Sequence, residues 1–252
     1  MENNKPLFSI ITVSFNSAKT IERTIISVIN QTYKDKIEYI IIDGGSTDGT
    51  LDIIKKYSDK ISYFVSEKDN GISDAFNKGI RASHGEIIGI INSDDWYEPD
   101  ALEIIAKLDK ENNTDFYVGS LKYWLSNDKN IIIKPDINYK RIITFFMPHL
   151  GHPSTFVKKS TYNDIGTYNT KYKYAMDYDL FLRGYLNKKN ICFTYKIIAN
   201  MFTGGVSHVN KEKAYKEVFI ASSNKILGII FYVLIIIKLR INKLFKIQKW
   251  KI

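Results

Sequence analysis

Four polar or acidic clusters follow four apolar runs in the first half of this 252-residue chain. The apolar runs alternate with segments of helical periodicity, which predicts parallel strands joined by helices. In open sheets of that kind, ligands bind beyond the carboxyl ends of the strands. The sequence therefore predicts one ligand-binding cleft built from all four clusters. They are Thr12–Asn16, Asp43–Thr50, Ser66–Gly71 and Asn92–Asp95.

The adjacent carboxylates Asp94 and Asp95 directly follow an apolar run. Two anions at the end of a buried strand are costly unless a cation neutralises them. Mn²⁺ or Mg²⁺ takes carboxylate oxygens and keeps positions open for phosphate oxygens. The pair thus predicts a divalent metal that binds a diphosphate. The alternative is that the Ser-Asp-Asp triplet only caps the helix that follows Pro99.

The glycine-rich segment Asp43–Thr50 (DGGSTDGT) permits a backbone turn close to a ligand, or simply ends a strand and opens a helix. It is not a Walker loop, because no Gly-Lys-Ser/Thr follows, and the chain has no GxGxxG. These absences exclude the two common phosphate-loop motifs.

The elements that must position these clusters form an α/β pattern with a mostly parallel sheet. Residues Ile21, Ile25 and Val28 fall on one face of a helix between the first two strands. Past residue 115 the pattern loosens, and the sequence carries no repeat or linker. We therefore expect one catalytic domain over 1–217, with a nucleotide-binding half (7–110) and an acceptor-facing half (111–217). The expected strands lie at 7–13, 37–43, 61–65, 86–92, 130–134 and 191–199, with a late helix at 176–188.

The net charge of +9, from 36 Lys and Arg against 27 Asp and Glu, is concentrated at the C-terminus. No acidic residue follows Glu217, whereas seven Lys and Arg do, so residues 1–217 carry only 9 − 7 = +2. The apolar run Ile226–Ile237 is shorter than the roughly 20 residues that a spanning helix needs. We therefore expect residues 218–252 to form a basic amphipathic tail on an anionic membrane surface. The alternative is a C-terminal helix packed on the core with a solvated cationic face.

The single cysteine, Cys192, cannot form an internal disulfide, and the polar N-terminus does not resemble a signal peptide. We therefore expect a cytoplasmic protein that lies peripherally on the inner face of the cell membrane. Nucleic acid is not an expected partner, because the charge lies in an isoleucine-rich tail without an RNA-binding motif.

Seven motifs in a fixed order, over residues 7–205, carry a resemblance to a known family. The chain resembles the family 2 glycosyltransferases of the GT-A fold, inverting bacterial enzymes that move a sugar from a nucleotide donor to an acceptor hydroxyl. The resemblance implies a UDP-sugar donor and an acceptor such as a lipid-linked saccharide of capsule, O-antigen or exopolysaccharide synthesis. The motifs are IITVSFN, IIDGGSTDGT, EKDNGISDAFNKGI, GIINSDDWY, HPSTFVKKSTYNDIGTYN, AMDYDLFLR and FTGGVS.

The same resemblance implies roles for individual residues at the donor. Asp43 would hydrogen-bond the base, and Asp95 would ligate the metal while Asp94 contacts ribose or donor sugar. Asp94 is also a candidate metal ligand, and His208 is either a further ligand or an ordinary loop residue. The remaining nucleotide-binding residues implied are Thr12, Phe15, Asn16, Asn70 and Gly71.

Asp177 would act as the general base, with Asp179 as its rival because Met176 stands where many members carry Glu. We expect Asp177 to pair with Arg183 and stay ionised. His149 and His152 have a spacing that could suit a metal, but no cysteine or carboxylate lies beside them in the sequence. The resemblance instead puts His152 in a loop near the acceptor, and Arg183 is a second acceptor candidate.

A sugar-phosphate nucleotidyltransferase would also use a parallel sheet and a metal. Its basic glycine-rich loop at the first strand is missing here, since no Arg or Lys precedes Lys19 in that segment. The sequence therefore favours the sugar transferase.

Overall fold

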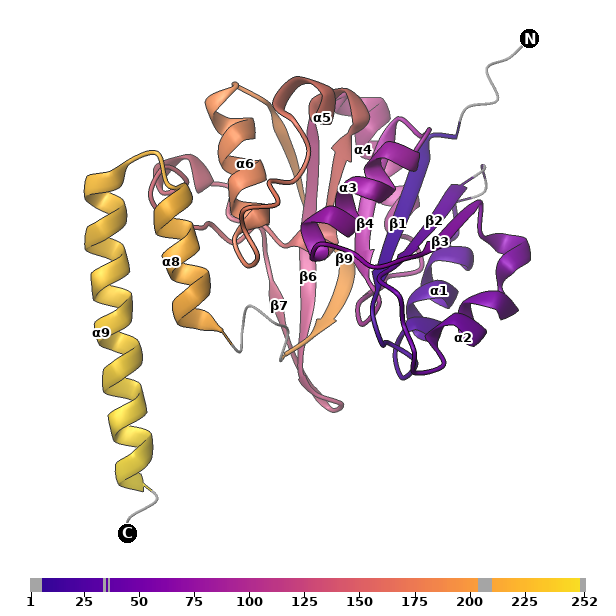
Figure 1. The fold of residues 1–252 in the computed structure, drawn as a ribbon. Coiled ribbons are helices and arrows are strands. Elements are labelled where there is room, and N and C mark those ends of the chain that lie inside the picture. The colour runs from indigo at the N-terminus through magenta and orange to yellow at the C-terminus, as the bar shows by residue number, and fades with distance from the viewer. Residues whose placement is uncertain (1–5, 34, 36, 204–209, 250–252) are drawn as a thin grey trace.

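Within the part of the chain that the structure describes, nine strands form one mixed sheet with helices on both faces (Figure 1). The structure is a computed structural model that describes residues 6–33, 35, 37–203 and 210–249, with side chains up to residue 241. The strand order is β3-β2-β1-β4-β8-β6-β9-β5, and β7 pairs with β6. The strands are β1 (Phe8–Ser14), β2 (Ile37–Asp43), β3 (Tyr63–Ser66), β4 (Ile87–Asn92), β5 (Trp96–Tyr97), β6 (Phe116–Ser126), β7 (Lys129–Ile133), β8 (Thr155–Lys158) and β9 (Ile191–Phe202).

The first four strands are parallel, as the sequence predicts. β1 lies between β2 and β4, so the chain moves outward to β3 and then crosses back to β4 on the other side of β1. All seven residues of β1 are buried, which is typical of a parallel strand covered on both faces. The reversal of strand order beside β1 makes the carboxyl ends of β1 and β4 the expected ligand edge.

Helices cover both faces of this sheet and create two hydrophobic cores. One core packs α1, α2 and α4 against the sheet, and the other packs α3, α5 and α6 on the opposite face. The helices are α1 (Ile21–Ile29), α2 (Thr50–Lys56), α3 (Ile72–Ala82), α4 (Ala101–Asn112), α5 (Lys159–Ile165), α6 (Met176–Leu186), α8 (Lys211–Ala221) and α9 (Lys225–Lys249), with short 3-10 turns η1 (Ser58–Lys60), η2 (Tyr139–Arg141) and η3 (His152–Ser154).

The second half of the sheet is less regular than the prediction of a mostly parallel sheet. β8 is antiparallel to both β4 and β6, whereas β9 returns parallel to β6. β7 pairs with β6 at the edge, which confirms the strand expected near 130–134. This half therefore extends the first sheet and brings η3 and α6 onto the face that carries α3.

The last two helices form a hairpin beside the sheet (Figure 1). The ring of Phe231 in α9 is tilted against those of Phe145 and Phe146, at centroid distances of 4.9 and 5.7 Å. Glu217 of α8 accepts hydrogen bonds from the backbone N–H groups of residues 173–175 at 3.2, 2.6 and 3.0 Å. The hairpin is thus attached both to the 145–146 segment and to the start of α6.

Among the helices that the structure describes, none combines the length and the apolar character that crossing a membrane requires.

Candidate active site

The polar clusters that follow the first strands meet at one edge of the sheet. Gly44 N donates to the Ser14 carbonyl at 2.8 Å, which joins the end of β2 to that of β1. Ser93 N donates to the Val13 carbonyl at 3.2 Å, and Ser93 Oγ bonds Ser17 Oγ at 2.7 Å. These bonds join the first, second and fourth clusters at this edge, as parallel strands require.

Asp43 organises this edge from a fully buried position at the end of β2. Its carboxylate accepts hydrogen bonds from Ser14, Ser46 and Ser66 hydroxyls at 2.8, 2.6 and 2.7 Å. Two backbone N–H groups, of Gly45 and Ser46, add bonds of 3.0 and 2.8 Å. Burial raises the pKa of Asp43, but these hydrogen bonds outweigh it and the pKa is lowered. Asp43 therefore stays ionised and fixes the glycine-rich turn, while its contact with a base stays a prediction.

The β1 loop presents two of its three predicted nucleotide-binding residues. Phe15 is 64% exposed, and Asn16 adopts a left-handed backbone with φ of 49°. Asn16 Oδ1 accepts from Thr47 N at 2.9 Å, so the first two clusters are tied side by side. Thr12 is instead fully buried and bonds Tyr39 Oη at 3.0 Å. Thr12 thus lies inside the sheet, and its contact with a nucleotide stays a prediction.

Asn70 and Gly71 are exposed at the end of the loop that connects β3 to α3. Gly71 has φ of 104°, a left-handed conformation that side chains rarely adopt. Asn70 N donates to Asp74 Oδ2 at 3.1 Å. The third cluster thus forms an open turn next to the other two, which is where the predicted nucleotide contact would occur.

The two adjacent carboxylates after β4 have opposite environments. Asp94 is exposed, whereas Asp95 is 1% exposed. Burial, followed by the neighbouring charge of Asp94, raises the pKa of Asp95 well above its usual range. The backbone carbonyl of Asp95 accepts from Thr24 Oγ1 at 2.6 Å, which holds the turn inward. The carboxylate that faces solvent is consequently Asp94.

Arg23 of α1 fixes this acidic turn from the other side. Its Nη2 donates to the Asp94 carbonyl at 2.8 Å, and its guanidinium carbon lies 3.7 Å from the ring centroid of Trp96. Phe202 also lies within 5.2 Å of the same guanidinium. The sequence does not predict this role of Arg23, because nothing in its helical segment distinguishes it from an ordinary surface cation.

The described residues include no group of three or more His, Cys, Asp or Glu side chains that could hold a metal by themselves. A hard divalent cation is commonly held by one or two carboxylates together with substrate phosphates. Asp94 presents an exposed carboxylate to such a site, and the metal contact of the buried Asp95 stays a prediction. His208, the further ligand considered, lies outside the described residues.

Asp177, in the first turn of α6, carries a buried and unpaired carboxylate oxygen. Its Oδ1 has no hydrogen-bond partner within the described part of the chain, and His152 Nδ1 lies 3.4 Å away. The side chain as a whole is 19% exposed, so it is reachable from outside. Burial raises the pKa of Asp177, and the nearby His152 partly opposes that effect. A carboxylate of this kind is suited to accept a proton.

Contacts with α3 bring the start of α6 toward the nucleotide edge. Asn77 Nδ2 donates to the Tyr168 carbonyl at 2.8 Å, and Ser73 Oγ donates to the Tyr172 carbonyl at 3.2 Å. His152 stacks on Phe76 of the same helix with centroids 4.9 Å apart. Since α3 begins at Ile72, directly after Gly71, the segment before Asp177 lies along the helix that follows the third cluster.

The expected pair between Asp177 and Arg183 is wrong. Arg183 Nε instead donates to Asp179 Oδ2 at 2.8 Å, because residues four apart are neighbours on a helix. Its other nitrogens donate to backbone carbonyls of residues 165–167. Arg183 thus closes the turn after α5, which leaves no basis for the acceptor contact expected of it. The rival carboxylate of Asp179 is held in this structural pair.

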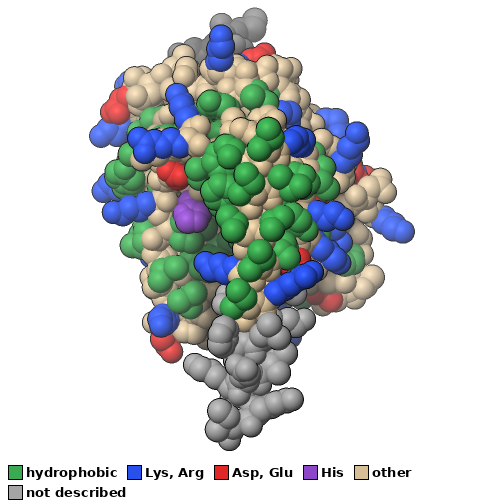
Figure 2. All heavy atoms as spheres, turned by 90° about the vertical axis from the view of Figure 1, so that its left-hand side faces the viewer, with side chains coloured by type: hydrophobic (Ala, Val, Ile, Leu, Met, Phe, Trp, Pro, Cys, Tyr) green, Lys and Arg blue, Asp and Glu red, His purple; other side chains and the backbone are tan. Residues whose placement is uncertain are grey.

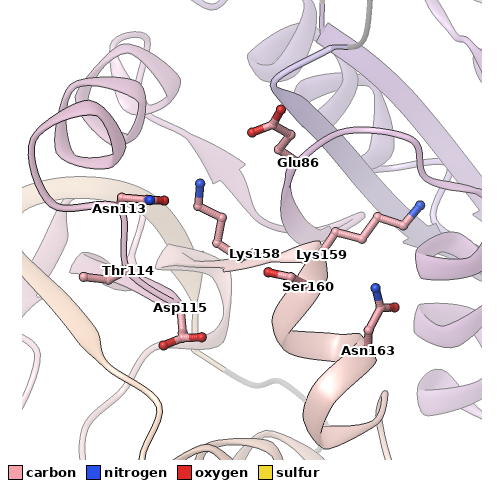
Figure 3. Close-up of a pocket in the computed structure, with 8 residues that line it drawn as sticks. All are labelled: Glu86, Asn113, Thr114, Asp115, Lys158, Lys159, Ser160 and Asn163. Carbon is pink, nitrogen blue, oxygen red and sulfur yellow. The ribbon is translucent and has the colours of Figure 1, made fainter.

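A cavity of about 520 Å³ lies at the opposite, amino-terminal edge of the sheet (Figure 3). Its lining residues include Glu86, which precedes β4, and Asp115, which precedes β6. Lys158 at this cavity pairs with Asp109 at 2.6 Å, and Lys159 donates to the Ser83 carbonyl. The cavity contains none of the predicted site residues, and its two lysines already have partners.

Two contacts near Asp177 could not be predicted from the sequence. Glu217 closes the start of α6 from α8, and His152 lies against Asp177, although each pair is distant along the chain. A local pattern carries no signal of such contacts.

Solved structures share this fold. The chain superposes on Staphylococcus aureus TarS 1–349 in complex with UDP-GlcNAc with a TM-score of 0.67 and 22% identity, covering 85% of this chain and 66% of that one. It superposes on a mannosyltransferase from Pyrobaculum calidifontis, in complex with GDP-Man and Mn²⁺, with a TM-score of 0.67 and 16% identity, covering 86% and 63%. At these identities the likeness concerns the fold alone.

Two relatives by sequence are closer. An uncharacterized glycosyltransferase of Rickettsia typhi is 34% identical over 206 residues, covering 77% of this chain and 63% of its own. The hyaluronan synthase of Pasteurella multocida is 33% identical over 187 residues, which are 72% of this chain and 19% of that protein. This chain therefore matches less than two thirds of the length of either relative.

The family model "Glycosyl transferase family 2" matches residues 9–174, which include the polar clusters, Asp94 and His152. With the sheet order and the helices around it, this match shows that the chain belongs to glycosyl transferase family 2 and has the GT-A fold.

Proposed function

We propose that this chain is an inverting glycosyltransferase that moves a sugar from a UDP-sugar to a hydroxyl group of a saccharide acceptor. The observation that carries the proposal is the buried carboxylate of Asp177 on α6, whose Oδ1 has no hydrogen bond to a described residue, beside the helix that begins at the nucleotide edge. Family membership supports the reaction class, and the structural neighbours that bind UDP-GlcNAc or GDP-Man support a nucleotide-sugar donor.

In the proposed reaction, Asp177 takes the proton of the acceptor hydroxyl as its oxygen attacks the anomeric carbon. The new glycosidic bond forms while the bond from that carbon to the donor diphosphate breaks, and the nucleoside diphosphate leaves. Attack opposite the leaving group inverts the anomeric configuration. The raised pKa of Asp177 makes it a stronger base than an ordinary aspartate.

Mn²⁺ or Mg²⁺ is the proposed cofactor, held by Asp94 rather than by Asp95. When bound, the cation would neutralise charge on the departing diphosphate. Asp94 is the exposed carboxylate of the pair, and Arg23 fixes its backbone. Phe15, Asn16, Asn70 and Gly71 form the exposed rim at which the nucleotide is proposed to bind.

A donor screen tests the proposal. The purified chain with Mn²⁺ is heated with UDP-glucose, UDP-GlcNAc, UDP-galactose, UDP-glucuronate or GDP-mannose. A donor at 100 times its Kd stabilises the native state by about 2.7 kcal/mol, which corresponds to a rise in Tm of roughly 5–10 °C. We expect such a rise with one of the UDP-sugars, followed by slow release of UDP. Release of pyrophosphate from UTP and a sugar phosphate would instead indicate a nucleotidyltransferase.

The acceptor is proposed to be a lipid-linked saccharide at the inner face of the cell membrane. Apolar side chains of α9 are exposed, and Lys225, Lys238 and Arg240 lie beside them in solvent. Figure 2 shows an extensive hydrophobic patch bordered by Lys and Arg on the side of the molecule that carries α9. Such a face suits the interface of an anionic leaflet. The exposed apolar residues are Ile226, Leu227, Ile229, Ile230, Phe231, Val233, Leu234, Ile237 and Ile241.

The double variant Ile226→Glu/Leu234→Glu is expected to lose at least tenfold in affinity for vesicles that contain phosphatidylglycerol. The two side chains are 75% and 58% exposed, so the fold tolerates the change while the apolar face gains two anions. Vesicle flotation measures the loss, and the affinity for UDP stays unchanged.

Ile132→Glu is the matched control, because that side chain is 52% exposed but belongs to β7 and not to α9. It is expected to bind vesicles like the wild type. Equal vesicle binding by all three proteins contradicts the membrane role of α9. A wild-type dimer that the double variant dissociates would assign this face to a second copy of the chain instead.

A further inference from the structure

A second titratable side chain lies against the proposed base. His152, in η3, has Nδ1 at 3.4 Å from Asp177 Oδ1. The two residues belong to separate elements, which meet because η3 and α6 lie on the α3 face of the sheet. The contact is therefore a product of the tertiary fold.

The imidazole of His152 is held in place on its other sides. Its ring stacks on Phe76 with an interplanar angle of 18°, and Tyr168 meets it edge-on with centroids 6.3 Å apart. Only 11% of the side chain is exposed. Its orientation toward Asp177 is consequently set by packing from α3 and from the segment before α6.

Each member of the pair also keeps a polar atom without a partner. His152 Nε2 and Asp177 Oδ1 are both buried, and neither has a hydrogen bond to any described residue. Buried polar atoms in proteins are normally bonded, and those that are not often belong to functional sites. Packing alone would place apolar side chains here more favourably.

We propose that His152, whose imidazole lies 3.4 Å from Asp177 Oδ1, is a positioning residue for Asp177 that keeps the carboxylate ionised and oriented to take the acceptor proton. The inference rests on the proposed function of Asp177 as the base. It replaces the acceptor contact that the resemblance implied for His152, because the imidazole faces a carboxylate of its own chain.

The neighbour that lowers the pKa of Asp177, against the larger effect of burial, is His152. Tyr162 of α5 and Tyr168 also interact with Asp177, but burial raises the pKa of each phenol, so both stay neutral. Burial raises the pKa of Asp177, and positive charge on His152 lowers it. Asp179, on the same helix, is paired with Arg183. Loss of the imidazole therefore raises the pKa of Asp177 further.

The variant His152→Phe tests the positioning role, because phenylalanine still stacks a ring on Phe76 but lacks the nitrogens of the imidazole. We expect kcat to fall about tenfold at neutral pH with KM for the donor unchanged. The acidic limb of the pH–rate profile, which reports ionisation of the base, is expected to move to higher pH. His152→Asn carries an amide near the position of Nδ1 and is expected to restore part of kcat. His149→Phe, an exposed histidine in the same segment, is the matched control and is expected to behave like the wild type.

A second measurement does not depend on catalysis. Carboxyl ¹³C NMR follows the titration of Asp177, with its signal assigned by its loss in Asp177→Asn. A higher titration midpoint in His152→Phe than in the wild type supports the pair, even if no acceptor is ever glycosylated and the proposed function fails. An unchanged midpoint and pH profile in a folded His152→Phe overturns it, even if the chain proves to be an active transferase. If His152→Phe does not fold, His152→Asn is titrated in its place with the same two outcomes.

Discussion

Asp177→Asn is expected to lower the rate of sugar transfer by about 10²–10⁴-fold, the usual effect of removing a general base. Asparagine has nearly the same shape, but it cannot take the acceptor proton. Affinity for UDP should stay unchanged, because Asp177 lies on α6 and not on the strand-end loops. Single-turnover transfer and calorimetric UDP binding together separate the two effects.

The pH dependence of the wild type follows from the same residue. Burial raises the pKa of Asp177, so the base is lost by protonation as the pH falls through that raised value. Because the folded state holds this proton more tightly than the unfolded chain, Asp177 also costs stability at higher pH. At pH 8, Asp177→Asn is therefore expected to unfold at a slightly higher temperature than the wild type. Its pH–rate profile is expected to lack the acidic limb.

Asp179→Asn is the control for this prediction. It removes the ion pair with Arg183, which holds the carbonyls of residues 165–167, so a lower Tm is expected with most activity retained. An inactive Asp179→Asn beside an active Asp177→Asn would make Asp179 the base.

The second large effect is expected at the two carboxylates after β4. Asp94→Asn should lose Mn²⁺-dependent donor binding and at least about 100-fold in rate, since charge stabilisation of the leaving group is often the largest catalytic contribution. Asp95→Asn should keep Mn²⁺-dependent binding, because its side chain is buried behind the turn. Calorimetry of UDP with and without Mn²⁺ compares the two variants directly.

The opposite pattern, with metal dependence lost in Asp95→Asn and kept in Asp94→Asn, would return the ligand role to Asp95. Equal UDP binding by the wild type in excess chelator would remove the metal from the proposal altogether.

The parallel half of the sheet could be predicted because its information is local. Apolar runs predict β1, β2, β3 and β4 to within two residues, and parallel strands place their carboxyl ends together whatever the rest of the chain does. The helix at 176–188 was likewise predicted, and α6 covers Met176–Leu186. The edge strand β7 followed from the same kind of pattern.

The orientation of side chains at the site depended on distant contacts. The sequence could not distinguish Asp94 from Asp95, because the hydroxyl of Thr24 in α1 holds the turn with Asp95 inside. Thr12 lies in a strand buried on both faces, so alternation gives no sign of which side chains reach the surface. The pair of His152 with Asp177 needs α3, η3 and α6 to be packed together first.

Glu217 fastens the backbone just before Asp177 to α8, which continues into the apolar face of α9. If α9 lies on a membrane as proposed, this attachment fixes the height of Asp177 above the bilayer. Acceptors would then be selected by the length between their lipid anchor and the hydroxyl that is glycosylated. A saccharide whose hydroxyl lies too close to its lipid anchor would fail to reach Asp177, however well the sugar itself fitted the site.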